Sequence, residues 1–228
     1  MKRIGIYGAG KGGITVLETI TQIRDKKGEL VTGTCFFDDN ENFIGTSIEN
    51  LPVYGGKKLF DYSLDIDYLV LAIADRGKKK ELYTKIKKKI NKKFYTVIHP
   101  ESYISSSVLI GEGSYIKSGA IIETNSCIGK CCIIDNNSII PHDNIIEDFV
   151  HIAPGATLGS SIVIGERTLV GIGANIITGM TIGSNVIIGA GACITFNVSA
   201  NSVVVGEKAK IIGRNKGWIA KIVNTGEK

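Results

Sequence analysis

Three histidines, His99, His142 and His151, are the side chains of this chain best suited to proton transfer near neutral pH. His142 precedes Asp143 in the segment PHD, and an adjacent carboxylate can fix the tautomer of an imidazole and stabilise its protonated form. A histidine oriented in this way can act as a general base. His99, in the segment IHP, is expected to be structural.

A second chemical signature is the glycine-rich segment GAGKGG, residues 8–13. It follows a predicted strand over residues 3–7 and precedes a helix that begins near residue 14. In the pattern G-x-G-x-x-G, Gly8, Gly10 and Gly13 allow a tight turn and let phosphate approach backbone N–H groups at a helix start. The segment therefore predicts a phosphate-binding loop.

Two acidic residues extend this prediction to a nucleotide. A second predicted strand, residues 30–37, ends at Asp38 and Asp39, either of which could bind a ribose hydroxyl. A third strand is predicted over residues 68–73. Strands that alternate with helices indicate a parallel α/β sheet. This half has only about a hundred residues, roughly two-thirds of a full dinucleotide domain, so we favour a nucleoside diphosphate as its ligand.

The positioning element of the second half is a repeat. From Ile98 to Ile194 every sixth residue is Ile, Leu or Val, which neither a helix nor a simple strand alternation produces. A hexapeptide solenoid does, and three hexads close one triangular coil of 18 residues. A generally smaller inward residue, such as Cys132, stands two places before each large one. Seven glycines that follow large residues are expected to supply the corner conformations: Gly111, Gly129, Gly159, Gly165, Gly171, Gly183 and Gly189.

The 18-residue length of the coil also predicts which residues are neighbours, because residues 18 apart stack directly. Ser160 should stack one coil above His142, where its backbone N–H could donate to an oxyanion. His151 is half a coil further on, so it lies on a different side of the prism and can join His142 only across a subunit boundary. The alternative for both histidines is a solvated residue at a solenoid surface.

Composition narrows the functional classes. The 228 residues carry a net charge of +5, and nine lysines lie between Lys78 and Lys93. We interpret this segment as a solvated helix face rather than a membrane-binding or nucleic-acid-binding surface, because Leu82 and Ile86 have helical spacing and interleaved aromatics are missing. We expect a cytoplasmic protein without stable membrane insertion, since neither a signal peptide nor a membrane span is evident.

The five cysteines are consistent with a reducing compartment, because their number is odd and they lack paired C-x-x-C spacing. A metal cluster of Cys127, Cys131 and Cys132 is disfavoured, because Cys132 falls on an inward position of the repeat. The sequence therefore predicts an α/β Rossmann-like domain over residues 1–97. An all-β left-handed parallel β-helix with a C-terminal extension is predicted over residues 98–228.

With these motifs in place, the chain resembles the hexapeptide-repeat acyltransferases that carry an N-terminal nucleotide-sugar domain. That family includes bacillosamine-pathway sugar N-acetyltransferases, GDP-perosamine N-acetyltransferases and sialic acid O-acetyltransferases. The resemblance rests on YGAGKGG, FFDDN, LPVYGG, VIHPESYIS, IIPHDNIIEDFVHIAPGATLG and IGAGACIT. It implies a homotrimer, with acyl-CoA between adjacent β-helices and the sugar nucleotide in the N-terminal domain.

The resemblance also implies residue roles. His142 would be the general base and Asp143 its orienting partner, with direct attack of the acceptor amine on acetyl-CoA and no metal. Substrate binding would fall to Gly8, Gly10, Lys11, Gly13, Asp38, Asp39, Asp135 and Asn136. Acyl-CoA binding would fall to His151, Ser160, Gly173, Gly189 and Gly191.

Several positions depart from the family pattern. Asp135 and Asn136 replace a common Asn-Thr, which bears on the sugar substituent that is recognised. Pro141 replaces a common Glu, and Ser160 replaces a frequent Gly. The usual Gly-x-Pro-Ala-Lys becomes GEKAK at residues 206–210. A tail with Trp218 follows, for which we expect packing on the solenoid or on a neighbour.

The leading interpretation is an N-acetyltransferase acting on a nucleotide-linked amino sugar, a UDP-4-amino-4,6-dideoxy sugar, in bacterial glycan biosynthesis. A rival is O-acetylation of a sialic acid. A β-helical zinc enzyme of the carbonic anhydrase type would need three converging histidines, but His99 lies more than two coils below His142. A non-catalytic module that binds NAD is the fourth alternative. The sugar, the nucleotide base (UDP, GDP or dTDP) and the acyl group stay open.

Overall fold

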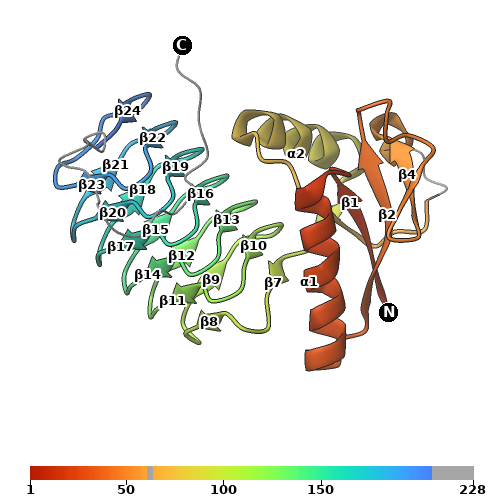
Figure 1. Ribbon diagram of the computed structural model, residues 1–228, viewed down its shortest axis with the longest axis horizontal. Coiled ribbons are helices and arrows are strands. Elements are labelled where there is room, and N and C mark those ends of the chain that lie inside the picture. The colour runs from red at the N-terminus through yellow and green to blue at the C-terminus, as the bar shows by residue number, and fades with distance from the viewer. Residues whose placement is uncertain (61–63, 207–228) are drawn as a thin grey trace, which may run out of the picture.

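The computed structural model describes residues 1–60 and 64–206, which form an α/β domain followed by a solenoid (Figure 1). The sequence expectations for GEKAK and Trp218 fall on residues 207–228 and lie outside the described residues, apart from Gly206. None of the helices in the described ranges is long and apolar enough to cross a bilayer.

The α/β domain is built on a six-stranded sheet with the order β3-β4-β2-β1-β5-β6. All neighbours are parallel except β3 and β4. The sheet leaves the carboxyl ends of β1, β2 and β5 side by side, where the glycine-rich segment follows β1. The strands are β1 (Lys2–Tyr7), β2 (Val31–Asp38), β3 (Ser47–Ile48), β4 (Leu51–Gly55), β5 (Tyr68–Leu71) and β6 (Lys93–Phe94), with a 3₁₀ turn at Gly56–Phe60.

Two helices cover opposite faces of this sheet. Helix α1 (Lys11–Lys27) packs Val16 and Ile20 against one face. Helix α2 (Arg76–Ile90) packs Ile86 against the other. The predicted strands and helices are thus present, with ends that differ by a few residues. The lysine-rich segment is helical as expected, but its description as a solvated face is wrong for Lys79, which is buried.

The solenoid confirms the 18-residue coil. Its strands form three parallel sheets of seven, six and five strands, and partners such as Tyr115 and Ile133 are one coil apart. The strands are β7 (Val97–Ile98), β8 (Tyr103–Ile104), β9 (Leu109–Ile110), β10 (Tyr115–Ile116), β11 (Ile121–Ile122), β12 (Cys127–Ile128), β13 (Ile133–Ile134), β14 (Ile139–Ile140), β15 (Ile145–Ile146), β16 (His151–Ile152), β17 (Thr157–Leu158), β18 (Val163–Ile164), β19 (Leu169–Val170), β20 (Asn175–Ile176), β21 (Thr181–Ile182), β22 (Ile187–Ile188), β23 (Cys193–Ile194) and β24 (Val203–Val204).

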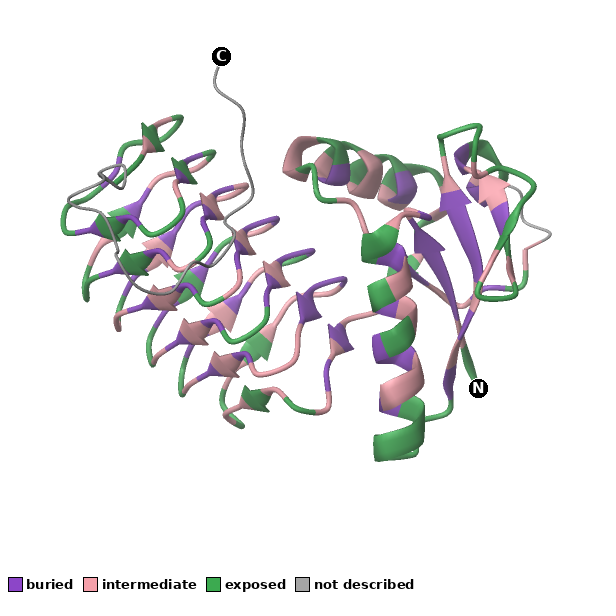
Figure 2. Cartoon of the chain, viewed as in Figure 1, coloured by how far each residue is buried: buried purple, intermediate pink, exposed green. Residues whose placement is uncertain are grey.

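The six-spaced apolar column fills the inside of this prism. Figure 2 shows that buried residues recur in successive coils. Ile116, Ile134 and Ile152 are fully buried, and the smaller inward residue Cys132 is buried as predicted. Burying each branched side chain contributes about 1.5 to 3 kcal/mol.

The prediction for the seven glycines is wrong. None of them has a positive φ; that conformation falls two residues later, at Gly113, Cys131, Ser161, Arg167, Gly173, Asn185 and Gly191. A methyl group on Gly165 would instead collide with backbone atoms of the next coil. These glycines are needed because successive coils approach closely, and the left-handed corners are formed by other residues, among them other glycines such as Gly173.

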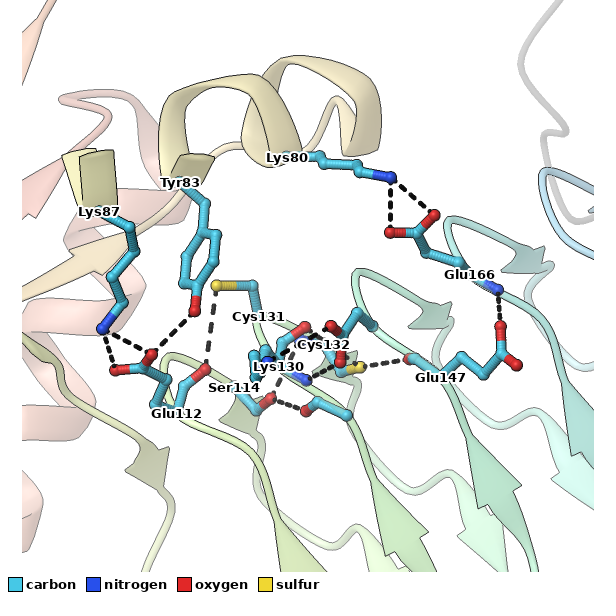
Figure 3. Close-up of polar contacts among 12 residues, drawn as sticks. Lys80, Tyr83, Lys87, Glu112, Ser114, Lys130, Cys131, Cys132, Glu147 and Glu166 are labelled. Atoms are coloured by element: carbon cyan, nitrogen blue, oxygen red, sulfur yellow. Dashed lines mark hydrogen bonds and ion pairs between the residues drawn. The ribbon is translucent and has the colours of Figure 1, made fainter. Parts of the chain in front are cut away.

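The two domains meet along one sheet of the prism, the sheet that contains β7, β10, β13 and β16 (Figure 1). Beneath α1, the hydroxyls of Thr19 and Tyr115 lie 2.7 Å apart. Figure 3 shows the other contact, where Tyr83 donates to Glu112 at 2.8 Å and Lys80 pairs with Glu166 at 2.8 Å. Helix α2 is therefore held against the edges of the solenoid coils.

Candidate active site

His142 lies at an exposed corner of the prism, between β14 and β15. Its Nδ1 is 2.7 Å from Asp143 Oδ2 and its Nε2 is 2.9 Å from Ser160 Oγ. The ring is thus held from both sides, while more than half of its side chain stays accessible (56%). The geometry is that of a hydroxyl, an imidazole and a carboxylate in line.

The local sequence explains why Asp143 can hold the ring. Its φ is 61°, a left-handed corner conformation that Asp tolerates better than most residues. Its Oδ1 also accepts from Asn125 Nδ2 at 3.3 Å, one coil below. The hydrogen bonds from His142 and then Asn125 lower the pKa of the Asp143 carboxyl below its usual value. Asp143 is therefore a carboxylate at neutral pH and can accept a hydrogen bond from Nδ1–H.

A buried asparagine that the sequence analysis overlooked braces this corner. Asn144 is fully buried at a small inward position, and its Nδ2 donates to Pro141 O at 2.7 Å and to Gly159 O at 3.0 Å. Its Oδ1 accepts from the backbone N–H of Ile162 at 2.8 Å. It thereby ties the turn that carries His142 to the turn one coil above. The sequence could have indicated this role, because Asn144 is a polar residue at an inward position of the repeat.

Ser160 stacks on His142 as the 18-residue coil predicts, but through a different group. Its hydroxyl faces the imidazole, whereas its backbone N–H donates to Thr178 Oγ1 at 3.3 Å. That length is at the weak end for an N–H···O hydrogen bond. The N–H proposed for the oxyanion is thus already engaged within the solenoid.

His151 belongs to a different side of the prism, as expected, and has its own carboxylate. It is the first residue of β16, and its Nε2 is 3.2 Å from Asp135 Oδ2. Lys117 Nζ pairs with Asp135 Oδ1 at 2.8 Å, and the backbone N–H of Asn136 donates to the same oxygen. Although burial opposes it, hydrogen bonding by His151, Lys117 and Asn136 lowers the pKa of Asp135 to about 2.

This second cluster, Lys117, Asp135 and His151, lies at the junction with the α/β domain. Lys117 is one coil below Asp135, so the 18-residue spacing could have predicted their pairing. Asp135 is buried, whereas Asn136 points to the exposed side of the coil. The junction therefore holds an enclosed, charged cluster, in contrast to the exposed corner of His142.

The glycine-rich segment forms the floor of an open groove at the carboxyl ends of the strands. Gly8 has a φ of 113°, and Gly13 has no room for a side chain because a methyl group would collide with Gly8 O. Asp38 accepts from the backbone N–H of Ala9 at 2.7 Å, so it braces the loop. Asp39 accepts from the hydroxyl of Tyr7 at 2.9 Å.

The groove has a volume of about 640 Å³. Gly8, Gly10, Asp38 and Asp39, which the sequence analysis assigns to substrate binding, line it, and Lys11 lies exposed at the start of α1. Lys78 and Lys85 of α2 also line it, although the sequence analysis had assigned these lysines only to a solvated face. Two cations opposite a glycine-rich turn suit a ligand that carries phosphate.

The three glycines assigned to acyl-CoA binding follow strands β19 and β22, which belong to the sheet that meets the α/β domain. Gly173 and Gly191 are one coil apart, both have a positive φ, and space is open around each. Gly189 lies against Val205 of the last coil. Within the described ranges, no three His, Cys, Asp or Glu side chains are grouped so that they could hold a metal.

Comparison with solved structures gives extensive matches. The perosamine N-acetyltransferase of Caulobacter crescentus, crystallised as a histidine variant with CoA and GDP-perosamine, has a TM-score of 0.82 and 27% identity, covering 94% of this chain and 98% of that chain. The acetyltransferase domain of PglB from Neisseria gonorrhoeae, in complex with acetyl coenzyme A, has a TM-score of 0.80 and 27% identity, covering 92% and 98%. The chain is a structural match to the hexapeptide-repeat sugar N-acetyltransferases.

WeeI from Acinetobacter baumannii also matches this sugar N-acetyltransferase architecture, with a TM-score of 0.78 and 29% identity, covering 90% of this chain and 97% of that chain. No protein-family model and no curated protein matches the sequence. The relation to the sugar N-acetyltransferases is thus carried by whole-chain structure, and the expectation drawn from the quoted motifs is confirmed at that level.

Proposed function

We propose that this protein is an acetyl-CoA-dependent N-acetyltransferase whose acceptor is a nucleotide-linked amino sugar. The observation that carries the proposal is the chain of contacts from Ser160 through His142 to Asp143 on an accessible corner. It occurs in a fold shared over nine-tenths of the chain with acetyltransferases of nucleotide sugars. We further propose a UDP-4-amino-4,6-dideoxy sugar as acceptor, for glycan biosynthesis in the bacterial cytoplasm.

The proposed chemistry follows from the two ring nitrogens. Asp143 accepts a hydrogen bond from Nδ1–H, which keeps the proton on Nδ1, so Nε2 carries the lone pair and serves as the general base. The sugar amine attacks the thioester carbonyl as Nε2 removes its proton. The C–N bond forms, the C–S bond breaks, and the protonated imidazole returns the proton to the leaving thiolate. Ser160 Oγ marks the position from which Nε2 receives that proton.

The two domains divide the work in this proposal. Residues 1–97 hold the nucleotide sugar, with Gly8, Gly10, Lys11 and Gly13 at the diphosphate and Asp38 or Asp39 at the ribose. Residues 98–228 hold acetyl-CoA along His151, Ser160, Gly173, Gly189 and Gly191 and supply the base. Asp135 and Asn136 contact the sugar.

The distribution of the histidines supports a homotrimer with shared sites. His142 lies between β14 and β15, whereas His151 lies in β16 on another side of the same prism. One chain therefore cannot bring both imidazoles to one substrate. A neighbouring chain in a ring can, with its His151 and nucleotide groove facing the His142 corner.

The test is an acetyl-transfer assay that detects free thiol. We expect thiol release with acetyl-CoA and a UDP-4-amino-4,6-dideoxy sugar, and none with the N-acetylated product. Failure with every nucleotide amino sugar, whether linked to UDP, GDP or dTDP, would sink the proposal. Turnover with sialic acid instead would establish O-acetylation, which can use the same base.

Calorimetry separates an enzyme from a nucleotide sensor. We expect UDP to bind the groove and NAD to give no heat of binding, because the domain is short for a dinucleotide. Binding of NAD without any acetyl transfer would favour the non-catalytic alternative.

A further inference from the structure

A cavity of about 150 Å³ lies between the α/β domain and the solenoid. It shares the lining residues Ala72 and Ile73 with the nucleotide groove, so the cavity and the groove are neighbours. Apolar side chains make most of its wall, and its polar lining includes the junction cluster. The residues that matter for its chemistry are Gly12, Lys79, Lys117, Cys132, Asp135 and His151.

Lys79 is the unusual member of this wall. Only 3% of the residue is exposed, and within residues 1–60 and 64–206 its ammonium has no carboxylate or carbonyl partner. Burial lowers the pKa of Lys79 to about 8; nearby Cys131 and Cys132 oppose the shift slightly, and Arg76 adds to it. A protonated amine with three donors and no acceptor is costly in such a place.

The surrounding acidic groups do not offset the cost of burying the Lys79 ammonium. Asp135, across the cavity, is already bonded to Lys117 and His151. The neighbouring lysines of α2 differ, because Lys80 pairs with Glu166 and Lys87 with Glu112. The cavity therefore contains one cation more than its acidic groups neutralise, and its own residues supply no counter-ion.

We propose that this cavity is a subsite for an anionic oxygen group of the acceptor substrate, held by Lys79. The proposal rests on the proposed function, because the cavity adjoins the groove assigned to the nucleotide sugar. The anionic oxygens come either from the diphosphate linkage or from a carboxylate on the sugar. In both cases the ligand supplies the partner that Lys79 lacks.

Binding calorimetry with UDP-glucose and UDP-glucuronate distinguishes the two sources. The variant is Lys79→Met, which keeps the apolar stem, and the matched control is Lys80→Met, which removes the adjacent lysine outside the cavity. If Lys79 holds the diphosphate, both ligands bind about tenfold or more weakly to Lys79→Met. If it holds a carboxylate, wild type prefers UDP-glucuronate and only Lys79→Met loses that preference. Unchanged binding of both ligands by Lys79→Met overturns the proposal.

Proton exchange gives a readout that simple loss of packing would not move. An anion paired with Lys79 raises the pKa of its ammonium, so wild type should take up protons on binding near pH 8.5. Calorimetry in buffers of different ionisation enthalpy detects this uptake. It should persist in Lys80→Met and disappear in Lys79→Met; equal uptake in all three proteins contradicts the assignment.

Measurements of thermal stability show whether Lys79→Met is folded. They also distinguish failure of the anion subsite from failure of the nucleotide-sugar assignment. Removing an unpaired buried charge should leave Lys79→Met at least as stable as wild type. If neither nucleotide sugar binds wild type, the groove assignment fails, and inorganic pyrophosphate and D-glucuronate at about 10 mM decide the role of Lys79. A rise in Tm in wild type but not in Lys79→Met keeps the anion subsite, whereas no rise in either protein overturns it.

Discussion

The two internal histidines of the solenoid differ in almost every physical respect. His142 is more than half exposed, with Asp143 and Ser160 as partners on neighbouring corner positions. His151 is enclosed at the domain junction and bonded to a buried carboxylate that Lys117 also neutralises. The first arrangement leaves Nε2 within reach of a substrate. The second fixes a charged wall beside a ligand cavity. In the proposed function, the same repeat thus carries a group for proton transfer and a group for substrate recognition.

Replacing each histidine by asparagine is the strongest way to separate these roles. His142→Asn should lower kcat by about a thousandfold, because it removes the general base. His151→Asn should act mainly on KM, by about tenfold, because it removes a contact to substrate and not the base. Steady-state acetyl transfer measures both. A loss of kcat from His151→Asn as large as that from His142→Asn would erase the distinction.

Asp143→Asn tests whether the corner carboxylate selects the tautomer. The amide can donate to Nδ1, which would move the ring proton to Nε2 and remove the lone pair that accepts the substrate proton. We expect kcat to fall about a hundredfold with little change in KM. Asp25→Asn, at an exposed carboxylate of α1 far from the site residues in sequence, serves as the control. Retention of full kcat by Asp143→Asn would show that the carboxylate is only a solvated corner residue.

Asp135→Asn tests whether the ionised carboxylate beside His151 stabilises the folded protein. Because the pKa of Asp135 is lowered to about 2 in the folded protein, its stabilisation is fully present above its usual value of 3.8. That stabilisation is lost as pH falls through about 2. The variant should lose about 2 kcal/mol of unfolding free energy near pH 6. Urea unfolding should show the difference from wild type shrinking below pH 4; a constant difference contradicts the ionised pair.

Ser160→Ala gives the smallest expected effect. In direct attack the hydroxyl only occupies the Nε2 position before the acceptor arrives, so kcat should stay within about threefold of wild type. The alternative is a covalent acetyl-serine, which the in-line contact with His142 would also permit. Intact-protein mass spectrometry after mixing with acetyl-CoA alone decides between them. An acetyl adduct on wild type that Ser160→Ala lacks would replace direct attack by a two-step mechanism.

The repeat explains what could be predicted from the sequence. A strict period of six fixed the coil, its inward column and the stacking of Ser160 on His142, because residues one coil apart must be neighbours. The period did not determine the directions of side chains. The sequence analysis therefore assigned the contact with the site to the backbone N–H of Ser160, whereas the structure places the Ser160 hydroxyl next to His142. The period also could not predict where the α/β domain packs against the solenoid. The burial of Lys79 depends on where α2 meets the solenoid, which no local pattern encodes.

The central claim is that one active site takes His142 from one chain and the junction cluster from its neighbour. The test mixes two impaired proteins, His142→Ala and a His151→Ala variant that also carries Asp135→Ala, by co-expression under separate tags. Activity is measured at an acceptor concentration below KM, where loss of the junction cluster lowers the rate. If the chains assemble at random into rings, about a quarter of the sites pair an intact His142 with an intact neighbouring cluster. Acetyl transfer should therefore recover to about a quarter of the wild-type rate. A mixture no more active than its better parent would place both groups in the site of a single chain and contradict the account.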